Sequence, residues 1–348
     1  MSITADSDTL VTVENVVKYF PVRTSGLIRR TVGHVHAVDD VTFSIPRGKT
    51  LGLVGETGSG KSTLARCIAG LIPITSGKVS FEGTPISGLS RRAMRPFRRE
   101  IQMIFQDPYG ALNPRRRVGA IIGDPFTIHG TATGAERKRQ VQELMERVGL
   151  NPEHYNRFPS EFSGGQRQRI GVARALALRP KLIICDEPVS ALDVSIQAQV
   201  LNLLSDLQQD FGLSYLFIAH DLEVVRHVSD TVAVMYLGRI VECGPKDLVY
   251  GSARHPYTTA LLSAAPAADP DTAASRQRII LTGEVPSPID PPSGCRFHPR
   301  CPKAQPLCSK TEPLLEVKAG DAATHATACH FPVEAGENLA VAGRSQLP

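Results

Sequence analysis

The chain has 348 residues, of which 42% are hydrophobic and 21% charged, a composition typical of a globular protein that buries a core. Only 5% of the residues are aromatic and none is tryptophan, which argues against an extended surface for stacking nucleic-acid bases. The formal net charge is +5, and the arginine runs at 91–99 and 115–117 are typical of solvated surfaces. We therefore expect no nucleic-acid partner.

The sequence contains no candidate membrane span and no secretory signal. No stretch approaches the ~18 apolar residues that a membrane-spanning helix requires. The amino terminus, MSITADSDTL, lacks a charged start followed by an apolar run. We expect a cytoplasmic chain, and any work at a membrane would require other subunits.

Strand and helix patterns alternate over the larger part of the chain, which is typical of a largely parallel α/β sheet. Nearly continuous apolar runs predict buried strands at 50–54, 181–185 and 214–219. Between them, apolar side chains recur at helical spacing in two segments, and Gly149 and Gly212 are placed to end those helices.

A phosphate-binding loop is predicted at 55–62, where GETGSGKS fits the pattern G-x-x-x-x-G-K-[ST] between a strand and a helical segment. Glycines let the backbone N–H groups point at phosphate oxygens, and the helix dipole favours the same negative charge. A glycine-rich turn that merely carries Lys-Ser is the alternative, but its strand and helix neighbours argue against it. The residues expected to bind ATP here are Gly55, Glu56, Thr57, Gly58, Ser59, Gly60, Lys61, Ser62 and Thr63.

Within this loop, Lys61 is expected to reach the β- and γ-phosphates and Ser62 to ligate Mg²⁺. A second acidic motif, LIICDE at 182–187, ends a predicted strand at the edge where such sheets bind ligands. Asp186 is expected to hold Mg²⁺ through its water shell, and Glu187 to orient and polarise the attacking water. One carboxylate for the metal and one for water suits phosphoryl transfer, which needs charge stabilisation and in-line positioning.

Further motifs resemble those of ABC-type ATPases. FSGGQRQRIGVARAL at 162–176 resembles the signature segment of that family, with Phe162 in place of the usual leucine. IFQDP at 104–108 is similar to the Q-loop, SALD at 190–193 to the D-loop, and IAHD at 218–221 to the switch-histidine motif. The order of these motifs along the chain makes coincidence negligible.

The resemblance implies that two such subunits sandwich two ATP molecules between them. Each ATP would contact the phosphate loop of one subunit and the signature segment of the other, and a helix N-terminus suits that anion. The signature residues assigned to the partner's ATP are Ser163, Gly164, Gly165 and Gln166.

The same resemblance assigns roles around the reacting phosphate. Gln106 would sense Mg²⁺ and the attacking water, as both a metal-site and a catalytic residue. His220 would hold the γ-phosphate and Glu187 in register. Phe20 would stack on adenine, with the adjacent Tyr19 as the alternative.

Longer segments look like the ATPase subunits of oligopeptide and dipeptide importers: FQDPYGALNPRRRVG, GPKDLVYGSARHPYTTALLSAAP and VPSPIDPPSGCRFHPRCPKA. Relatives in that group also handle nickel, opines and other small solutes. The resemblance implies an ATPase that powers import, together with a second ATPase subunit, two transmembrane permease subunits and an extracytoplasmic solute-binding protein. Such a subunit would lie at the cytoplasmic face of the inner membrane.

A soluble ABC ATPase of DNA repair or translation is the alternative. Those proteins usually carry coiled-coil insertions or two cassettes, whereas this sequence has one cassette and no long heptads.

The expected fold class is α/β: a P-loop, ABC-type nucleotide-binding domain followed by a small C-terminal cysteine-bearing domain. We expect the ATPase domain at 1–262, with its core at 12–250. A linker rich in Pro, Ala and Asp is predicted at 263–282, the oligopeptide/dipeptide transporter C-terminal domain at 283–332, and a poorly ordered tail at 333–348.

Four cysteines crowd into the C-terminal segment, at positions Cys295, Cys301, Cys308 and Cys329. Because cytosolic thiols are kept reduced, four of them favour a metal site over disulfides. Cys₄ suits Zn²⁺ or an iron–sulfur cluster equally by ligand count, but the wide, proline-bracketed spacing favours a [4Fe–4S] cluster. Importer ATPases with this C-terminal pattern also resemble cluster-bearing members of the family. A zinc site, a disulfide and free thiols remain the alternatives for these cysteines. A metal centre would staple a segment with few large apolar residues.

Overall fold

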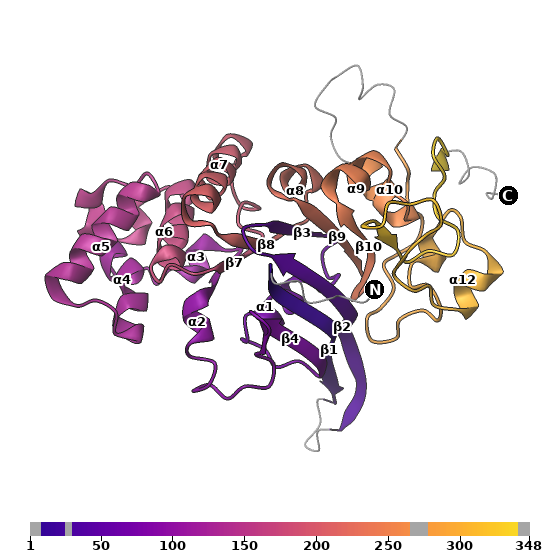
Figure 1. Cartoon of the computed structure of the whole chain (residues 1–348), viewed down its shortest axis with the longest axis horizontal. Coiled ribbons are helices and arrows are strands. Elements are labelled where there is room, and N and C mark those ends of the chain that lie inside the picture. Colours follow the sequence, from indigo (N-terminus) through magenta and orange to yellow (C-terminus); the bar gives the residue numbers. More distant parts are fainter. Residues whose placement is uncertain (1–7, 25–29, 265–277, 340–348) are drawn as a thin grey trace.

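The computed structural model describes residues 8–24, 30–264 and 278–339. Within these residues, eight strands form one sheet in the order β11-β12-β10-β9-β3-β8-β7-β6, and four form a second sheet in the order β2-β1-β4-β5 (Figure 1). The strands of the large sheet are β3 (Thr50–Val54), β6 (Ile101–Ile104), β7 (Leu182–Asp186), β8 (Ser214–Ala219), β9 (Thr231–Tyr236), β10 (Arg239–Pro245), β11 (Glu316–Val317) and β12 (Ala326–Thr327). The small sheet contains β1 (Thr9–Arg23), β2 (Thr31–Pro46), β4 (Ser76–Phe81) and β5 (Thr84–Pro85).

The predicted α/β class is confirmed, and the three predicted central strands are β3, β7 and β8. All residues of these strands are buried, as expected for parallel strands that are covered on both faces. β8 pairs in parallel with β3 and with β7, and their carboxyl ends are in register. Val54 lies opposite Ala219, and Asp186 lies opposite Ile218, so the segments that follow these strands leave the sheet side by side.

Helices pack on the large sheet and beyond one of its edges (Figure 1). α1 (Lys61–Ile68) packs against strands of both sheets, while α4 to α7 gather beyond the β6–β7 edge. The two helices predicted from periodicity are α5 and α7; Gly149 and Gly212 follow them with φ of +73° and +63°. None of the described helices is both long and apolar enough to cross a bilayer. The remaining bounds are α2 (Phe97–Glu100), α3 (Pro108–Ala111), α4 (Val118–His129), α5 (Gly134–Arg147), α6 (Gly164–Leu176), α7 (Val194–Phe211), α8 (Leu222–Val228), α9 (Lys246–Gly251), α10 (Pro256–Ala264) and α12 (Pro306–Lys310).

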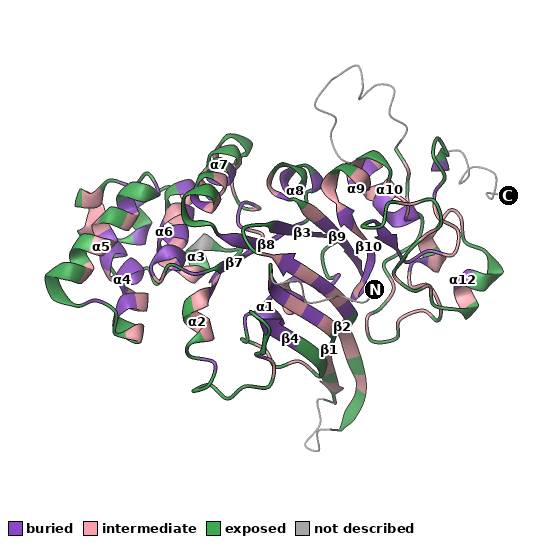
Figure 2. Ribbon diagram, viewed as in Figure 1, coloured by how far each residue is buried: buried purple, intermediate pink, exposed green. Residues whose placement is uncertain are grey.

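Short 3₁₀ helices lie at Pro152–Asn156, Pro159–Glu161 and His298–Arg300. Buried residues concentrate along the central strands and the inward faces of the helices, whereas the outer faces of α5 and α7 are exposed (Figure 2).

The C-terminal segment packs directly onto the ATPase sheet. β12 pairs antiparallel with β10, with Glu242 opposite Thr327, and so extends the large sheet. The Phe297 side chain belongs to the main hydrophobic core and is 1% exposed. A separate small domain is therefore not confirmed, and the domain boundaries stay a prediction. Most of the predicted linker, residues 265–277, lies outside the described residues.

The start of the predicted tail is packed. Val333 and Leu339 are buried. The Val333 N–H donates to the carbonyl oxygen of Arg254, and the Arg254 side chain donates to the carbonyl oxygen of Val333. The Arg254 side chain also pairs with Asp321 at 3.0 Å. The expectation of poor order is thus wrong for 333–339, because apolar side chains and backbone hydrogen bonds hold that part; 340–348 lie outside the described residues.

A fully buried carboxylate, that of Glu242 on β10, joins the C-terminal segment to the helices before it. It accepts hydrogen bonds from the backbone N–H groups of Arg254 and His255, at 2.7 and 3.0 Å, and contacts His325 Nε2 at 2.7 Å. Burial lowers the pKa of His255 to about 4, which keeps that ring neutral, although the charge of Glu242 opposes the shift. Three segments distant in sequence thus depend on one carboxylate.

We predict that Glu242→Ala destabilises the protein by about 3 kcal/mol or more, because it leaves two backbone donors and His325 without their buried acceptor. Urea unfolding followed by far-UV circular dichroism measures the change. The matched control is Glu143→Ala, since Glu143 is 57% exposed and its ion pair is with Arg139, which is 62% exposed. That control should change the free energy of unfolding by less than about 0.5 kcal/mol; equal effects of the two variants would contradict the assignment.

Candidate nucleotide-binding site

The loop between β3 and α1 closes around the side chain of Lys61. Its ammonium donates hydrogen bonds to the carbonyl oxygens of Gly55 and Glu56, at 2.6 and 2.9 Å, and lies 3.3 Å from Ser59 Oγ. Burial lowers the pKa of Lys61, while the charges of Glu187, Asp186 and Glu56 oppose that shift. Among the described residues, no carboxylate forms an ion pair with this ammonium. A buried cation held only by loop oxygens fits an anionic ligand such as a nucleotide phosphate.

The two residues predicted to share Mg²⁺ are in contact. Ser62 Oγ, at the start of α1, donates to Asp186 Oδ1 at 2.7 Å. Burial raises the pKa of Asp186, and the hydrogen bond from Ser62 opposes the rise. Arg66 lies at the limit of ion pairing with Asp186, at 4.0 Å. A hydroxyl and a carboxylate side by side next to a phosphate loop are oxygen donors of the kind that Mg²⁺ prefers.

The predicted catalytic residues meet on one carboxylate oxygen. Gln106 Nε2 donates to Glu187 Oε2 at 2.8 Å, and His220 Nδ1 lies 3.3 Å from the same atom. The Glu187 backbone has a φ of +49°, an unusual conformation for a residue other than glycine, and its N–H donates to Ile218 O. Strained backbone of this kind is most often retained at functional sites.

An open hollow of about 500 Å³ lies over this carboxylate. Asp107, Ser190 and Ala191 also line this hollow. They lie in the IFQDP and SALD motifs, but the sequence assigned no role to them. Asp107 accepts a hydrogen bond from the N–H of Tyr109 and so begins α3, while Ser190 Oγ donates to the backbone oxygen of Glu187 at 3.1 Å. The residues lining the hollow are Thr57, Gln106, Asp107, Glu187, Ser190, Ala191 and His220.

The signature segment lies apart from the phosphate loop. Ser163 begins α6 in a capping box: its Oγ accepts from Gln166 N, and its own N–H donates to Gln166 Oε1 at 3.0 Å. A Cβ at Gly165 would lie 2.4 Å from Ile196, so the close packing of α6 on α7 requires glycine there. Figure 1 shows α6 and α1 in separate parts of the molecule, with β7 between them. Within one chain, the signature therefore does not complete the site.

The two candidate adenine-stacking residues differ in their surroundings. Tyr19 stacks on His36 with ring centroids 4.1 Å apart, and its hydroxyl donates to Asp39 at 2.7 Å. Burial and this hydrogen bond raise the pKa of Tyr19 to about 12. Phe20 is only half-buried, and its ring contacts the ammonium of Lys18. The structure thus engages Tyr19 in the protein's own network, which favours Phe20 for the stacking role.

The four C-terminal cysteines line one small cavity, with room for about one water molecule (≈10 Å³). All four are free thiols, and Cys308 and Cys329 are buried. Burial raises the pKa of Cys301 to about 12 and that of Cys329 to about 11. Within the described part of the chain, no three His, Cys, Asp or Glu side chains gather closely enough to hold a single metal ion. The four cysteines predicted to share a site thus line the same cavity, but their side chains do not form a site for a single metal ion.

The fold and the site define an ATP-binding cassette. Residues 38–190 match the family model for "ABC transporter", and residues 241–308 match that for "Oligopeptide/dipeptide transporter, C-terminal region". The dimeric, post-hydrolysis structure of the ATP-binding cassette MJ0796 bound to ADP and Pi superposes with a TM-score of 0.60 at 27% identity. That superposition covers 68% of this chain and 99% of the other. For cbiO1 from Clostridium perfringens the TM-score is 0.61 at 26% identity, covering 70% and 92% of the two chains.

Sequence relatives place the chain more narrowly. It is 54% identical to the oligopeptide transport ATP-binding protein AppF of Bacillus subtilis, over 94% of this chain and 98% of AppF. It is 57% identical to the oligopeptide transport ATP-binding protein OppF of Salmonella typhimurium, over 80% and 84% of the two chains. The chain belongs to the oligopeptide/dipeptide branch of the ABC transporter ATP-binding proteins.

We predict that Gly60→Ala disrupts the phosphate loop. A Cβ there would lie 2.0 Å from the backbone oxygen of Ala37, at a φ of +105°, so a loss of stability of at least about 3 kcal/mol is expected. Gly58→Ala is the matched control, because its φ is also positive, at +83°, but its Cβ would meet nothing within 4 Å. The control should lose only about 1 kcal/mol. Thermal unfolding without nucleotide compares the two, and similar melting temperatures would refute the backbone-contact argument.

Proposed function

We propose that this chain binds and hydrolyses ATP with Mg²⁺ and thereby energises the import of oligopeptides, dipeptides or related small solutes, nickel and opines included. The observation that carries the proposal is the Glu187 carboxylate, held by Gln106 and His220 beside the Lys61 loop. The compared relatives are oligopeptide and di/tripeptide transport ATP-binding proteins, which favours peptides as the solute. Their descriptions also favour transport over the alternative of a soluble ATPase for DNA repair or translation.

The chain's own residues provide the nucleotide and metal sites. Lys61 and the N–H groups of the loop bind the phosphates, while Ser62, Asp186 and Gln106 hold Mg²⁺. Bound Mg²⁺ supplies charge neutralisation at the β- and γ-phosphate oxygens. Phe20 stacks on the adenine ring.

Glu187 orients and polarises the attacking water by accepting a hydrogen bond from it at a carboxylate oxygen. Gln106 and His220 fix that carboxylate in place, since both contact Oε2. Glu187 is 12% exposed, so few water molecules compete for it, whereas His220 is 54% exposed and can reach a phosphate in the hollow. This arrangement supports positioning and electrostatic stabilisation, the main requirements of phosphoryl transfer.

A second ATPase subunit, identical or homologous, completes the site. Ser163, Gly164, Gly165 and Gln166 present the N-terminus of α6 to the ATP held by that partner. The position of α6 away from α1 within one chain supports this proposal, as does the dimeric state of the MJ0796 cassette. The other partners that we propose are two transmembrane permease subunits and an extracytoplasmic solute-binding protein, with this chain at the cytoplasmic face of the inner membrane.

We predict that Glu187→Gln keeps ATP affinity within about twofold of the wild-type value but lowers turnover at least about 100-fold, because the amide keeps the shape and loses the charge that orients water. The test uses the chain assembled with its permease subunits and measures peptide-stimulated phosphate release. Glu146→Gln, at an exposed position on α5, is the control and should behave as wild type. Near-normal turnover in Glu187→Gln would remove this carboxylate from the mechanism.

We also propose that Cys295, Cys301, Cys308 and Cys329 hold a [4Fe–4S] cluster with a structural or regulatory role. The donor set is right in number and kind, and the four thiols face one cavity. The proposal rests on the number and kind of these donors and on the cavity that they share.

Protein purified without oxygen should therefore be brown, with broad absorption near ~400 nm and about four iron atoms per chain. Cys301→Ser should make the segment beyond residue 264 more sensitive to protease, because it removes one of the four ligands that would hold this segment together. Stoichiometric zinc without iron would replace the cluster by the zinc alternative. Finding neither metal would remove both.

A further inference from the structure

The phosphate loop is held from the cysteine-bearing segment by an arginine far away in sequence. Arg300 donates to both carboxylate oxygens of Glu56: Nη1 to Oε2 at 2.9 Å and Nη2 to Oε1 at 3.3 Å. The Arg300 side chain is 9% exposed and that of Glu56 27%, so this two-bond pair is largely shielded from water. Such charge-assisted, two-bond pairs between arginine and a carboxylate are stronger and more directional than single bonds.

Packed aromatic rings fix the geometry of this pair. The hydroxyl of Tyr257 accepts a hydrogen bond from the Glu56 N–H at 2.9 Å, and Tyr236 Oη lies 3.5 Å from Arg300 Nη1. Phe297, three residues before Arg300, packs its ring against both tyrosines, with centroids 5.2 and 5.3 Å away. All three rings are almost fully buried, so the hydroxyl groups that contact the Glu56 backbone and the Arg300 side chain are held in place by the core.

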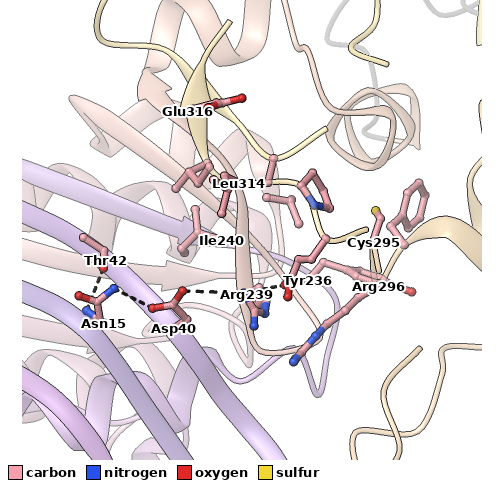
Figure 3. A pocket seen from close by; sticks show the side chains of 16 residues that line it. Asn15, Asp40, Thr42, Tyr236, Arg239, Ile240, Cys295, Arg296, Leu314 and Glu316 are labelled. Atoms are coloured by element: carbon pink, nitrogen blue, oxygen red, sulfur yellow. Dashed lines mark hydrogen bonds and ion pairs between the residues drawn. The ribbon is translucent and has the colours of Figure 1, made fainter. Parts of the chain in front are cut away.

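A second arginine of the same segment holds the other side of the loop. Arg296 Nη1 donates to Leu237 O at 2.6 Å, and its other terminal nitrogen pairs with Asp39. The next residue, Gly238, donates its N–H to Ser59 O of the phosphate loop at 2.9 Å. Figure 3 shows Arg296 beside Cys295, with Tyr236 and Arg239 on the strands that it faces. The segment thus supports the loop at two points.

The charge of Glu56 matters because it stands in a loop that binds an anion. Its field reaches the ammonium of Lys61, where it opposes the effect of burial. An unpaired carboxylate in the loop would repel the phosphates, and that repulsion is poorly screened in a partly buried site. Arg300 both neutralises this charge and sets the direction of the side chain.

We propose that Arg300 is a positioning residue for ATP binding: by pairing with Glu56 it neutralises a carboxylate that would otherwise repel the phosphates, and so makes nucleotide affinity depend on the cysteine-bearing segment. This inference rests on the proposed function, because it assigns ATP to that loop. Arg300 acts through Glu56 and has no part in the chemical step.

The test compares four variants of the full-length chain, purified without oxygen: Arg300→Gln, Arg300→Lys, Glu56→Gln and the double variant Glu56→Gln/Arg300→Gln. Arg300→Gln should raise the Kd for ATP and the KM about tenfold, with kcat within about twofold, since a free carboxylate then faces the phosphates. Arg300→Lys should lie between, because lysine keeps the charge and loses the two-bond geometry. Glu56→Gln, which keeps the loop backbone and removes its negative charge, should lower the Kd for ATP.

The double variant distinguishes neutralisation of the Glu56 charge from a purely structural role of Arg300. It should bind ATP within about twofold of wild type, because removal of the carboxylate removes the repulsion that Arg300 offsets. Arg139→Gln, at a side chain that is 62% exposed, is the control and should change nothing. If Arg300→Gln does not fold, Glu56→Gln still tests the proposal: a tenfold loss of affinity there would overturn it.

Unchanged affinity in Arg300→Gln, or a double variant as weak as Arg300→Gln, would also overturn the inference. In those cases ATP still binds to the wild-type chain, and the proposed function stands. A wild-type chain that fails to bind ATP, with Lys61→Ala indistinguishable from it, would instead overturn the proposed function, and this inference with it.

Discussion

The site depends on one constraint: the parallel register of β3, β8 and β7. These strands end level with one another, so the segments that leave them emerge at the same edge of the sheet. The phosphate loop follows β3, Asp186 ends β7, and His220 follows β8. A slip of one residue in this register would turn each following side chain away from its partners. The continuous apolar runs that bury these strands therefore also determine the geometry of the chemistry.

Buried charge is balanced residue by residue at this edge. Lys61 has only oxygen partners of the loop, Asp186 has the Ser62 hydroxyl, and Glu187 has Gln106 and His220. Among the described residues, the His220–Glu187 contact at 3.3 Å is ionic only when the imidazole is protonated, and the next ion pair of these groups is Arg66 to Asp186 at 4.0 Å. Charged groups that are already in position and lack a counter-ion favour a ligand of opposite charge over water. They need little reorganisation when that ligand binds.

The sequence predicted these groups because their signals are local. Lys61 and Ser62 lie in one short motif between a strand and a helix, and Asp186 with Glu187 ends an apolar run. The three central strands could be placed for the same reason, since apolar continuity is read within a few residues. Asp107 and Ser190 went unassigned although they lie in quoted motifs, because their roles depend on backbone contacts that only the fold creates.

Contacts between distant parts of the chain could not be predicted, because no local sequence motif marks them. Glu242 meets His325 across the β10–β12 pairing, and composition alone gave the proline-rich segment the appearance of a separate unit. Its buried Phe297 and the strand that it adds to the sheet instead make it part of the ATPase core.

The same packing gives the cysteine-bearing segment a short physical route to the nucleotide. Phe297 lines the thiol cavity and also contacts Tyr257, whose hydroxyl holds the backbone of Glu56. Only two side chains therefore stand between the thiols and the phosphate loop. Cores this closely packed transmit displacement because their side chains have little free volume in which to relax. A rearrangement at the cysteines that moved Phe297 would therefore also disturb Tyr257, whose hydroxyl accepts the hydrogen bond from the Glu56 N–H in the phosphate loop.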